Sequence, residues 1–146
     1  MSRVFTYSFE DTAATISHPN FGQYSAYGTG LGDITVSMAN DVTSHDRSAD
    51  LSVVISKHVY KDGTITFNVL QSSDFHNWLK KFTSFIENSP SDRFASGSIV
   101  IKNTSTGDSF TCRGVSHQKK PDVKYTAQAG TIDWVFMAAE IIYSNI

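Results

Sequence analysis

Alternation of apolar and polar residues, repeated along most of the chain, is the feature that most restricts the fold. In the segments 64–69 and 131–136, every second residue is a large apolar one, and the residues between them are threonine, asparagine or aspartate except for Val135. Successive side chains of a strand point to opposite faces of a sheet, so a period of two predicts strands with one buried face. The same pattern predicts strands at residues 5–10, 34–38, 64–69, 98–102 and 131–136.

Short turn signals lie between these segments. Asp62-Gly63 predicts a tight hairpin that joins residues 57–60 to 64–69, and Thr106-Gly107-Asp108 predicts another before the strand at Phe110. Sequential hairpins imply antiparallel pairing, so we expect a mainly β protein, an antiparallel β-sandwich or barrel. A length of 146 residues predicts a single domain, residues 1–146.

One segment has a different period. From Ser72 to Asn88 the large apolar residues recur at spacings of three and four, which indicates one face of an α-helix. Ser72 or Ser73 is suited to cap its first amides, and Pro90 follows just past its end. We therefore expect one flanking helix across an open end or face of the sheet.

Two stretches read as irregular. Residues 19–32 are rich in glycine and predict a flexible loop, and residues 40–50 predict a long polar loop. A polar loop of that length in a compact domain is usually functional or disordered.

A search for reactive groups finds no enzyme signature. The single cysteine, Cys112, is interpreted as a small buried hydrophobe, and the five histidines are scattered without metal-ligand spacing. The glycines at 28–32 lead into a strand and do not open a helix, so they do not predict a phosphate loop. We expect no catalytic residues, no cofactor and no metal.

Charge and hydropathy exclude further classes. A net charge of −2 lacks the basic surplus that is typical of nucleic-acid binders. The first ten residues predict no secretory signal, and no apolar run approaches the ~20 residues of a membrane span.

Several motifs, in order along nearly the whole chain, resemble the PhiTE-like tail tube proteins of contractile-tailed bacteriophages. The last block is the most specific, because a Gly-Asp turn, Lys-Lys-Pro-Asp and Gly-x-x-x-Trp-x-Phe follow one another at the expected separation. The loop expected at 40–50 and the strand expected at 51–60 depart from the glycine-rich version of the family. The motifs are Tyr7–Asp11 with Ala14–Ile16, Gly32–Met38, Asp62–Phe67, Val69–Ser73, Gly107–Arg113, Lys119–Asp122 and Gly130–Phe136.

The resemblance implies a structural virion protein made in the host cytoplasm. Such proteins form hexameric rings whose sheets join edge to edge, and the rings stack into a hollow tube that conducts the genome. The implied partners are other copies, the sheath protein, and the baseplate hub and tail terminator proteins, with DNA passing through without specific binding. Serine, threonine and asparagine opposite the core would line a wet lumen, and an acidic lumen would repel phosphate.

Within this hypothesis, we expect the segment 40–60 to form an arm that reaches a neighbouring subunit or ring. The predicted inter-subunit contacts are Val42, Thr43, Ser44, His45, Asp46, Arg47, Lys57 and Lys61.

Other functions remain open. One alternative is a tube subunit of a pyocin-like or type VI-like injection machine. Another is a monomeric β-sandwich module for carbohydrate or peptide, for which Tyr24, Tyr27 and Tyr60 are the candidate aromatics. No set of residues supports a hydrolase.

Overall fold

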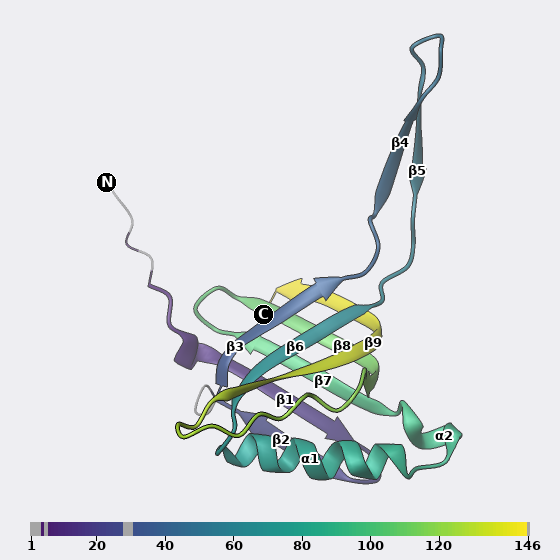
Figure 1. Ribbon diagram of the computed structural model, residues 1–146. Helices are drawn as coiled ribbons and strands as arrows, with labels where there is room; N and C mark the ends of the chain where they lie inside the picture. Colours follow the sequence, from purple (N-terminus) through teal and green to yellow (C-terminus); the bar gives the residue numbers. More distant parts are fainter. Residues whose placement is uncertain (1–3, 5, 28–30, 146) are drawn as a thin grey trace.

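A computed structural model describes residues 4, 6–27 and 31–145 (Figure 1). Within these residues a seven-stranded antiparallel sheet has the order β2-β1-β7-β8-β9-β6-β3, and β4 and β5 pair only with each other. The predicted mainly antiparallel β fold with one flanking helix is confirmed. The strands are β1 (Thr12–His18), β2 (Gly22–Ala26), β3 (Leu31–Met38), β4 (Thr43–Arg47), β5 (Val53–Lys57), β6 (Gly63–Leu70), β7 (Gly97–Asn103), β8 (Asp108–His117) and β9 (Thr131–Asn145).

The strongly alternating segments form the middle of the sheet. In β6 and in the first half of β9, every second side chain is buried, and the register places Phe67 opposite Trp134 and Ile65 opposite Phe136. The turn at 104–107 joins β7 to β8 as expected. Pairs of this kind on one face stabilise a sheet through contact between opposite side chains.

The predicted strand at 5–10 is wrong for the residues that the structure describes. Tyr7 and Ser8 lie outside any strand, and Phe9–Asp11 form a 3-10 helix. The Ser8 hydroxyl accepts a hydrogen bond from the Glu10 amide (3.2 Å), so a local cap replaces a strand ladder here. Phe5 lies outside the described residues.

The predicted Asp62-Gly63 hairpin is also wrong. β5 ends at Lys57 and pairs with β4, whereas β6 lies between β3 and β9. The Asp62 carbonyl accepts from the Ala39 amide (3.0 Å), so Asp62-Gly63 brings β6 back beside β3. The β3–β6 pairing prevails because it buries apolar residues of β6.

The predicted loop at 19–32 contains β2 and the start of β3. β2 pairs with β1, and the Tyr24 ring stacks on Phe75 of the helix with centroids 5.2 Å apart. This aromatic contact holds a segment whose glycines indicated a loop. Residues 28–30 lie outside the described part of the chain.

Helix α1 (Asp74–Glu87) contacts both β2, at one edge of the sheet, and β6, next to the other edge. The Ser73 hydroxyl caps it by accepting from the His76 amide (3.2 Å), and after Pro90 a short helix α2 (Ser91–Phe94) follows. Phe75 contacts Tyr24 of β2 and, edge to face, Phe67 of β6 (5.6 Å). α1 therefore covers the inner face of the sheet (Figure 1). No helix within the described residues is long and apolar enough to cross a membrane.

The core lies between α1 and the inner face of the sheet. Phe82 is fully buried. Its ring centroid lies 4.9 Å from that of Trp78 and 6.4 Å from that of Phe136. Burial of each large side chain stabilises by about 1.5–3 kcal/mol. The core residues are Ala14, Ile16, Ala26, Leu31, Ile65, Phe67, Val69, Phe75, Leu79, Phe82, Ile86, Ile99, Ile101, Cys112, Val115, Ile132, Trp134, Phe136, Ala138 and Ile141.

One buried polar pair ties α1 to β9. The Trp134 indole donates to His76 Nδ1 (3.0 Å), and His76 is only 5% exposed. Burial first, and then the nearby Lys80 charge, lower the pKa of His76 below its ordinary value. The imidazole is therefore neutral at pH 7.

Gly114 lies at a register shift between β7 and β8, where it has no partner residue in the β7 pairing. Its φ of +65° is rare for other residues, and a Cβ there would lie 2.8 Å from the Ala139 Cβ of β9. Only glycine fills this position without strain.

Replacement of Phe82 by alanine tests the contact between helix and sheet. We expect Phe82→Ala to lower the free energy of unfolding by about 3–5 kcal/mol, because it leaves a cavity at the centre of the core. Lys81→Ala, on the exposed face of α1, is the matched control and should change it by less than about 0.5 kcal/mol. Urea unfolding measures both, and equal midpoints for the two variants would contradict the packing.

The His76–Trp134 pair predicts a pH dependence. A lowered folded pKa means that stability is fully present above the ordinary value of about 6.5 and is lost as pH falls through the folded value. Protonation would place a second donor opposite the Trp134 indole. Unfolding free energies between pH 8 and 5 should fall more steeply for wild type than for His76→Gln, and parallel curves would exclude this role.

Gly114→Ala should destabilise by about 2 kcal/mol or more, since a left-handed backbone and a steric clash combine there. Gly130→Ala is the matched control, because nothing lies within 4 Å of its added Cβ and its φ is not positive. Thermal denaturation of the two variants measures the difference. A Gly114→Ala melting temperature equal to that of Gly130→Ala would contradict it.

Candidate interaction surfaces

The β4–β5 hairpin projects from the body of the molecule on the side away from α1 (Figure 1). At its base the side-chain amide of Asn40 donates to Asp62 Oδ1 (2.7 Å), and the backbone amide of His58 donates to the Val42 carbonyl (2.7 Å). Its ladder pairs Thr43 with Lys57 at the bottom. The predicted long polar loop is therefore one strand and the tip of an ordered ribbon.

The structure gathers the eight predicted contact residues on and below this ribbon. Thr43–Arg47 are β4 itself, Val42 precedes it, and Lys57 is the last residue of β5. Lys61 lies at the base, where its carbonyl accepts from the Ile141 amide of β9 (2.8 Å). The predicted arm has a defined shape, and its contact with another subunit stays a prediction.

The tip of the hairpin is held by Asp50. The Ser48 hydroxyl and the Ser52 amide (3.1 Å) both donate to Asp50 Oδ1. These hydrogen bonds, the Ser48 one foremost, lower the pKa of Asp50 to about 2. Leu51 beside it has a φ of +70° and is 83% exposed, so the turn presents an apolar side chain at its end.

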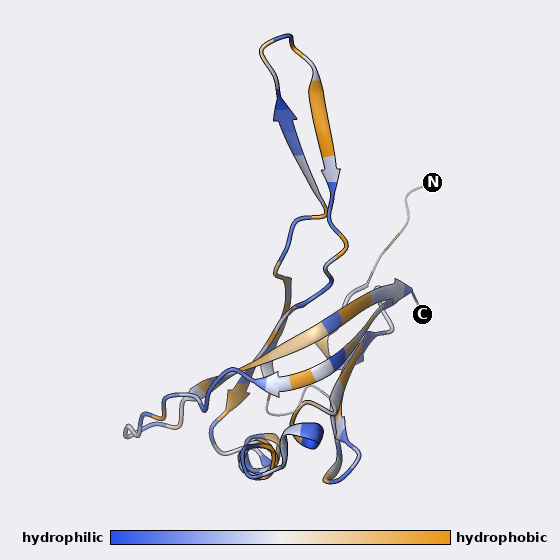
Figure 2. Ribbon diagram, turned by 90° about the vertical axis from the view of Figure 1, so that its right-hand side faces the viewer, coloured by the Kyte–Doolittle hydropathy of each residue, from blue (hydrophilic) through white to orange (hydrophobic). Residues whose placement is uncertain are grey.

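The strand expected at residues 51–60 is present as β5, but its pairing with β4 and its exposed apolar side chains were not predicted. Val53, Val54 and Ile55 of β5 are all exposed, Ile55 by 62%, and Figure 2 shows β5 as the apolar strand beside polar β4. The run of β-branched residues at 53–55 was the available signal. An exposed apolar run on a two-stranded ribbon is typical of an interface.

The main sheet has two open edges. β2 pairs only with β1, and β3 pairs only with β6, so each leaves a row of backbone groups without a neighbour strand among the described residues. Such edges invite pairing with another chain. They lie at opposite ends of the strand order.

The outer face of the sheet is rich in hydroxyl and amide groups. Ser17 Oγ lies 2.9 Å from Ser98 Oγ across β1 and β7, and the Asn68 amide donates to Asp133 Oδ1 (2.7 Å) across β6 and β9. Thr35 and Thr66 are opposite one another on β3 and β6. These hydroxyl and amide groups bond one another across neighbouring strands.

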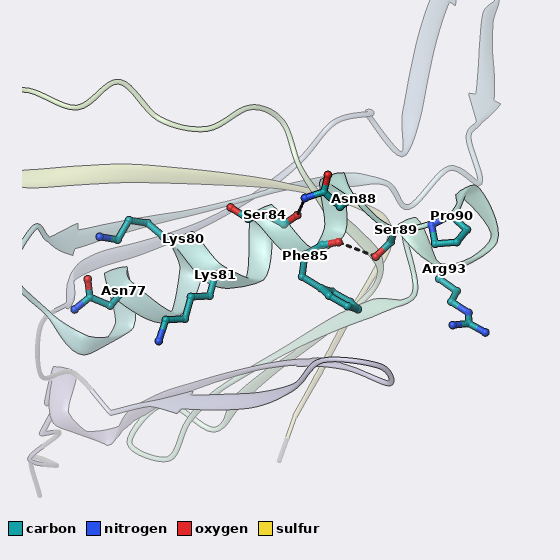
Figure 3. Close-up of a pocket in the computed structure, with 9 residues that line it drawn as sticks. All are labelled: Asn77, Lys80, Lys81, Ser84, Phe85, Asn88, Ser89, Pro90 and Arg93. Carbon is teal, nitrogen blue, oxygen red and sulfur yellow. Dashed lines mark hydrogen bonds between the residues drawn. The ribbon is translucent and has the colours of Figure 1, made fainter.

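A shallow hollow of about 920 Å³ lies along the solvent side of α1 and the start of α2 (Figure 3). Ser89 Oγ donates to the Phe85 carbonyl (2.7 Å) and the Asn88 amide to the Ser84 carbonyl (2.9 Å), so the end of the helix is fixed by its own side chains. The lining residues are Asn77, Lys80, Lys81, Ser84, Phe85, Asn88, Ser89, Pro90 and Arg93.

Beside the hollow, Glu87 is bound by two cationic or proton-donating partners. Its Oε1 lies 2.8 Å from His117 Nε2, and its Oε2 lies 3.3 Å from Lys120 Nζ. The hydrogen bond with His117 and then those with Lys120 lower the pKa of Glu87. Glu87 thus ties the chain after β8 to α1.

The groups that could carry chemistry are dispersed. Among the described residues, no three His, Cys, Asp or Glu side chains lie close enough to hold a metal ion. Cys112 is fully buried, as interpreted, and burial raises the pKa of its thiol to about 11. Tyr24 is packed against α1, so the three tyrosines proposed for a ligand module do not form one exposed cluster.

Comparison with known proteins identifies a family. Residues 4–144 match the family model described as bacteriophage PhiTE tail tube protein. No curated protein matches the chain.

Solved structures from contractile machines share the fold. The cap of the anti-feeding prophage, which terminates its tube, is similar with a TM-score of 0.64 and 10% identity, over 100% of this chain and 95% of that one. The tube terminator of the extracellular contractile injection system PVC gives 0.62 and 8%, over 98% and 99%. The PVC sheath-tube complex gives 0.59 and 9%, over 97% and 93%. At such identities the likeness shows the fold alone.

Proposed function

Because the chain belongs to the bacteriophage PhiTE tail tube protein family, it is a structural protein of the tail tube, and we propose that it forms stacked hexameric rings that conduct the genome. The observation that carries the proposal is the β4–β5 hairpin. Its exposed apolar strand is built to contact another subunit. No catalytic role is required of any residue.

The open edges of the sheet support ring formation. In a ring, the β3 edge of one subunit pairs with the β2 edge of the next, so that the backbone groups of both edges are satisfied. Such a contact joins two different surfaces, and it closes into a ring when its rotation allows. The ring number of six comes from the family resemblance.

The hairpin supplies the contact between rings. A two-stranded ribbon is marginal in water on its own. When Leu51, Val54 and Ile55 are buried against a neighbouring ring, the ribbon gains apolar burial that the monomer lacks. The predicted contacts from Val42 to Arg47 lie on the same ribbon, with Lys57 and Lys61 at its base.

The polar outer face of the sheet lines the lumen in this arrangement. Its hydroxyls and amides already bond one another, and its charged residues are of both signs, with Asp33, Asp133 and Glu140 beside Lys102 and Arg113. DNA therefore passes without specific binding. α1 lies on the other side of the sheet and faces outward, toward the sheath, while the baseplate hub and terminator proteins meet the ends of the tube.

Removal of the hairpin tests the proposal. Replacement of Thr43–Lys57 by a short Gly-Ser linker should leave the fold and its melting temperature intact, because the ribbon contributes nothing to the core. Negative-stain microscopy should show tubes for wild type and none for the variant. Normal tubes without the hairpin would overturn its role in assembly.

A point variant sharpens the test. Ile55→Asp should raise the concentration needed for tube formation by about tenfold or more, roughly 1.4 kcal/mol per subunit contact. Tyr125→Asp is the control, since Tyr125 is 86% exposed and lies outside the hairpin. Equal effects of the two variants would count against a specific hairpin contact.

A further inference from the structure

The charged residues that line the hollow beside α1 are all positive. Lys80, Lys81 and Arg93 are its only charged residues, and no carboxylate lines it. The whole chain carries a net charge of −2, so three cations gathered in one hollow are a local departure from the rest of the molecule.

These three cations have no internal partner. Among the described residues, the ion pairs of this region are those of Glu87 with His117 and Lys120, and none involves Lys80, Lys81 or Arg93. Glu87, the helix's last acidic residue, is already bound by both of its oxygens. The charge of the hollow is therefore available to a group from outside.

Neutral donors and an apolar floor accompany the charge. Asn77 and Ser84 line the hollow with polar groups, and Phe85 contributes its ring (Figure 3). The ring centroids of Phe85 and Phe21 are 5.1 Å apart, so the Phe85 ring is held by packing. A carboxylate-bearing segment with one or two apolar side chains is the chemistry that this lining fits.

We propose that the hollow docks an acidic segment of the sheath subunit. This inference rests on the proposed function, which places α1 on the outside of the tube, where the sheath lies. The sheath segment sets its carboxylates against Lys80, Lys81 and Arg93, and an apolar side chain covers Phe85. Contact of this kind between exposed charges is weakened by salt.

Nucleic acid is the other polyanion that three cations attract. The structure favours protein, because the hollow is a single short site on a chain of net charge −2, whereas nucleic-acid binders typically carry a basic surplus. Binding of DNA is an outcome that the test distinguishes.

The first test uses tails assembled in host cells. The hollow variant combines three charge reversals, Lys80→Glu, Lys81→Glu and Arg93→Glu. In negative stain it should give tubes of normal length without sheath. The control reverses Lys119 and Lys124, which are exposed and lie outside the hollow, and should give sheathed tails. Sheathed tails at wild-type frequency from the hollow variant would overturn the proposal.

The second test uses purified tubes and a fluorescent glutamate-rich peptide. We expect the peptide to bind wild-type and control tubes, and the hollow variant to bind at least about tenfold more weakly. Absence of binding to wild type, or a DNA duplex that binds as tightly through the same residues, would exclude an acidic protein partner. Whether the wild-type protein forms tubes is measured separately. A failure of peptide binding therefore contradicts the sheath contact and leaves the proposal of tube assembly unaffected.

Discussion

The contact between α1 and the inner face of the sheet is the interaction on which the rest of the structure depends. The sheet is open and curved. Aromatic contacts with α1 connect β2, at one edge of the sheet, to β6, next to the other edge. Phe75 contacts both Tyr24 of β2 and Phe67 of β6, and Phe82 reaches Phe136 of β9. The Trp134–His76 hydrogen bond adds a polar tie within this apolar layer. Because the helix closes the inside, both edges and the outer face of the sheet are left for other subunits.

Much of the fold could be predicted where a strand buries one face. β6 and the first half of β9 alternate strictly, because each side chain meets either the core or solvent. α1 was predicted to within two residues of its ends, since its apolar spacing and its Ser73 cap are local signals. The β7–β8 turn was found for the same reason.

Prediction failed where structure depends on distant or external partners. β4 reads Thr-Ser-His-Asp-Arg and is exposed on both faces, so it has no alternation to detect. β2 is held by Tyr24 against a helix fifty residues away, which no local pattern encodes. Of the candidate site, the eight predicted contact residues lie on or below the hairpin, and a strand was expected at 51–60, but its pairing with β4 and its exposed apolar side chains were not predicted. The hollow beside α1 combines residues of two helices and has no sequence signature.

The position of the hairpin has a consequence for direction. It leaves the sheet only where β3 ends and β6 begins, so a subunit has one end with a projecting ribbon and one without. In the proposed stack, copies joined through it would all point the same way, so the polymer would be vectorial. Its leading rim and its trailing rim would then expose different chemistry. A protein that caps one rim would be excluded from the other by shape alone, and a single gene product would thereby distinguish the two ends of the tube.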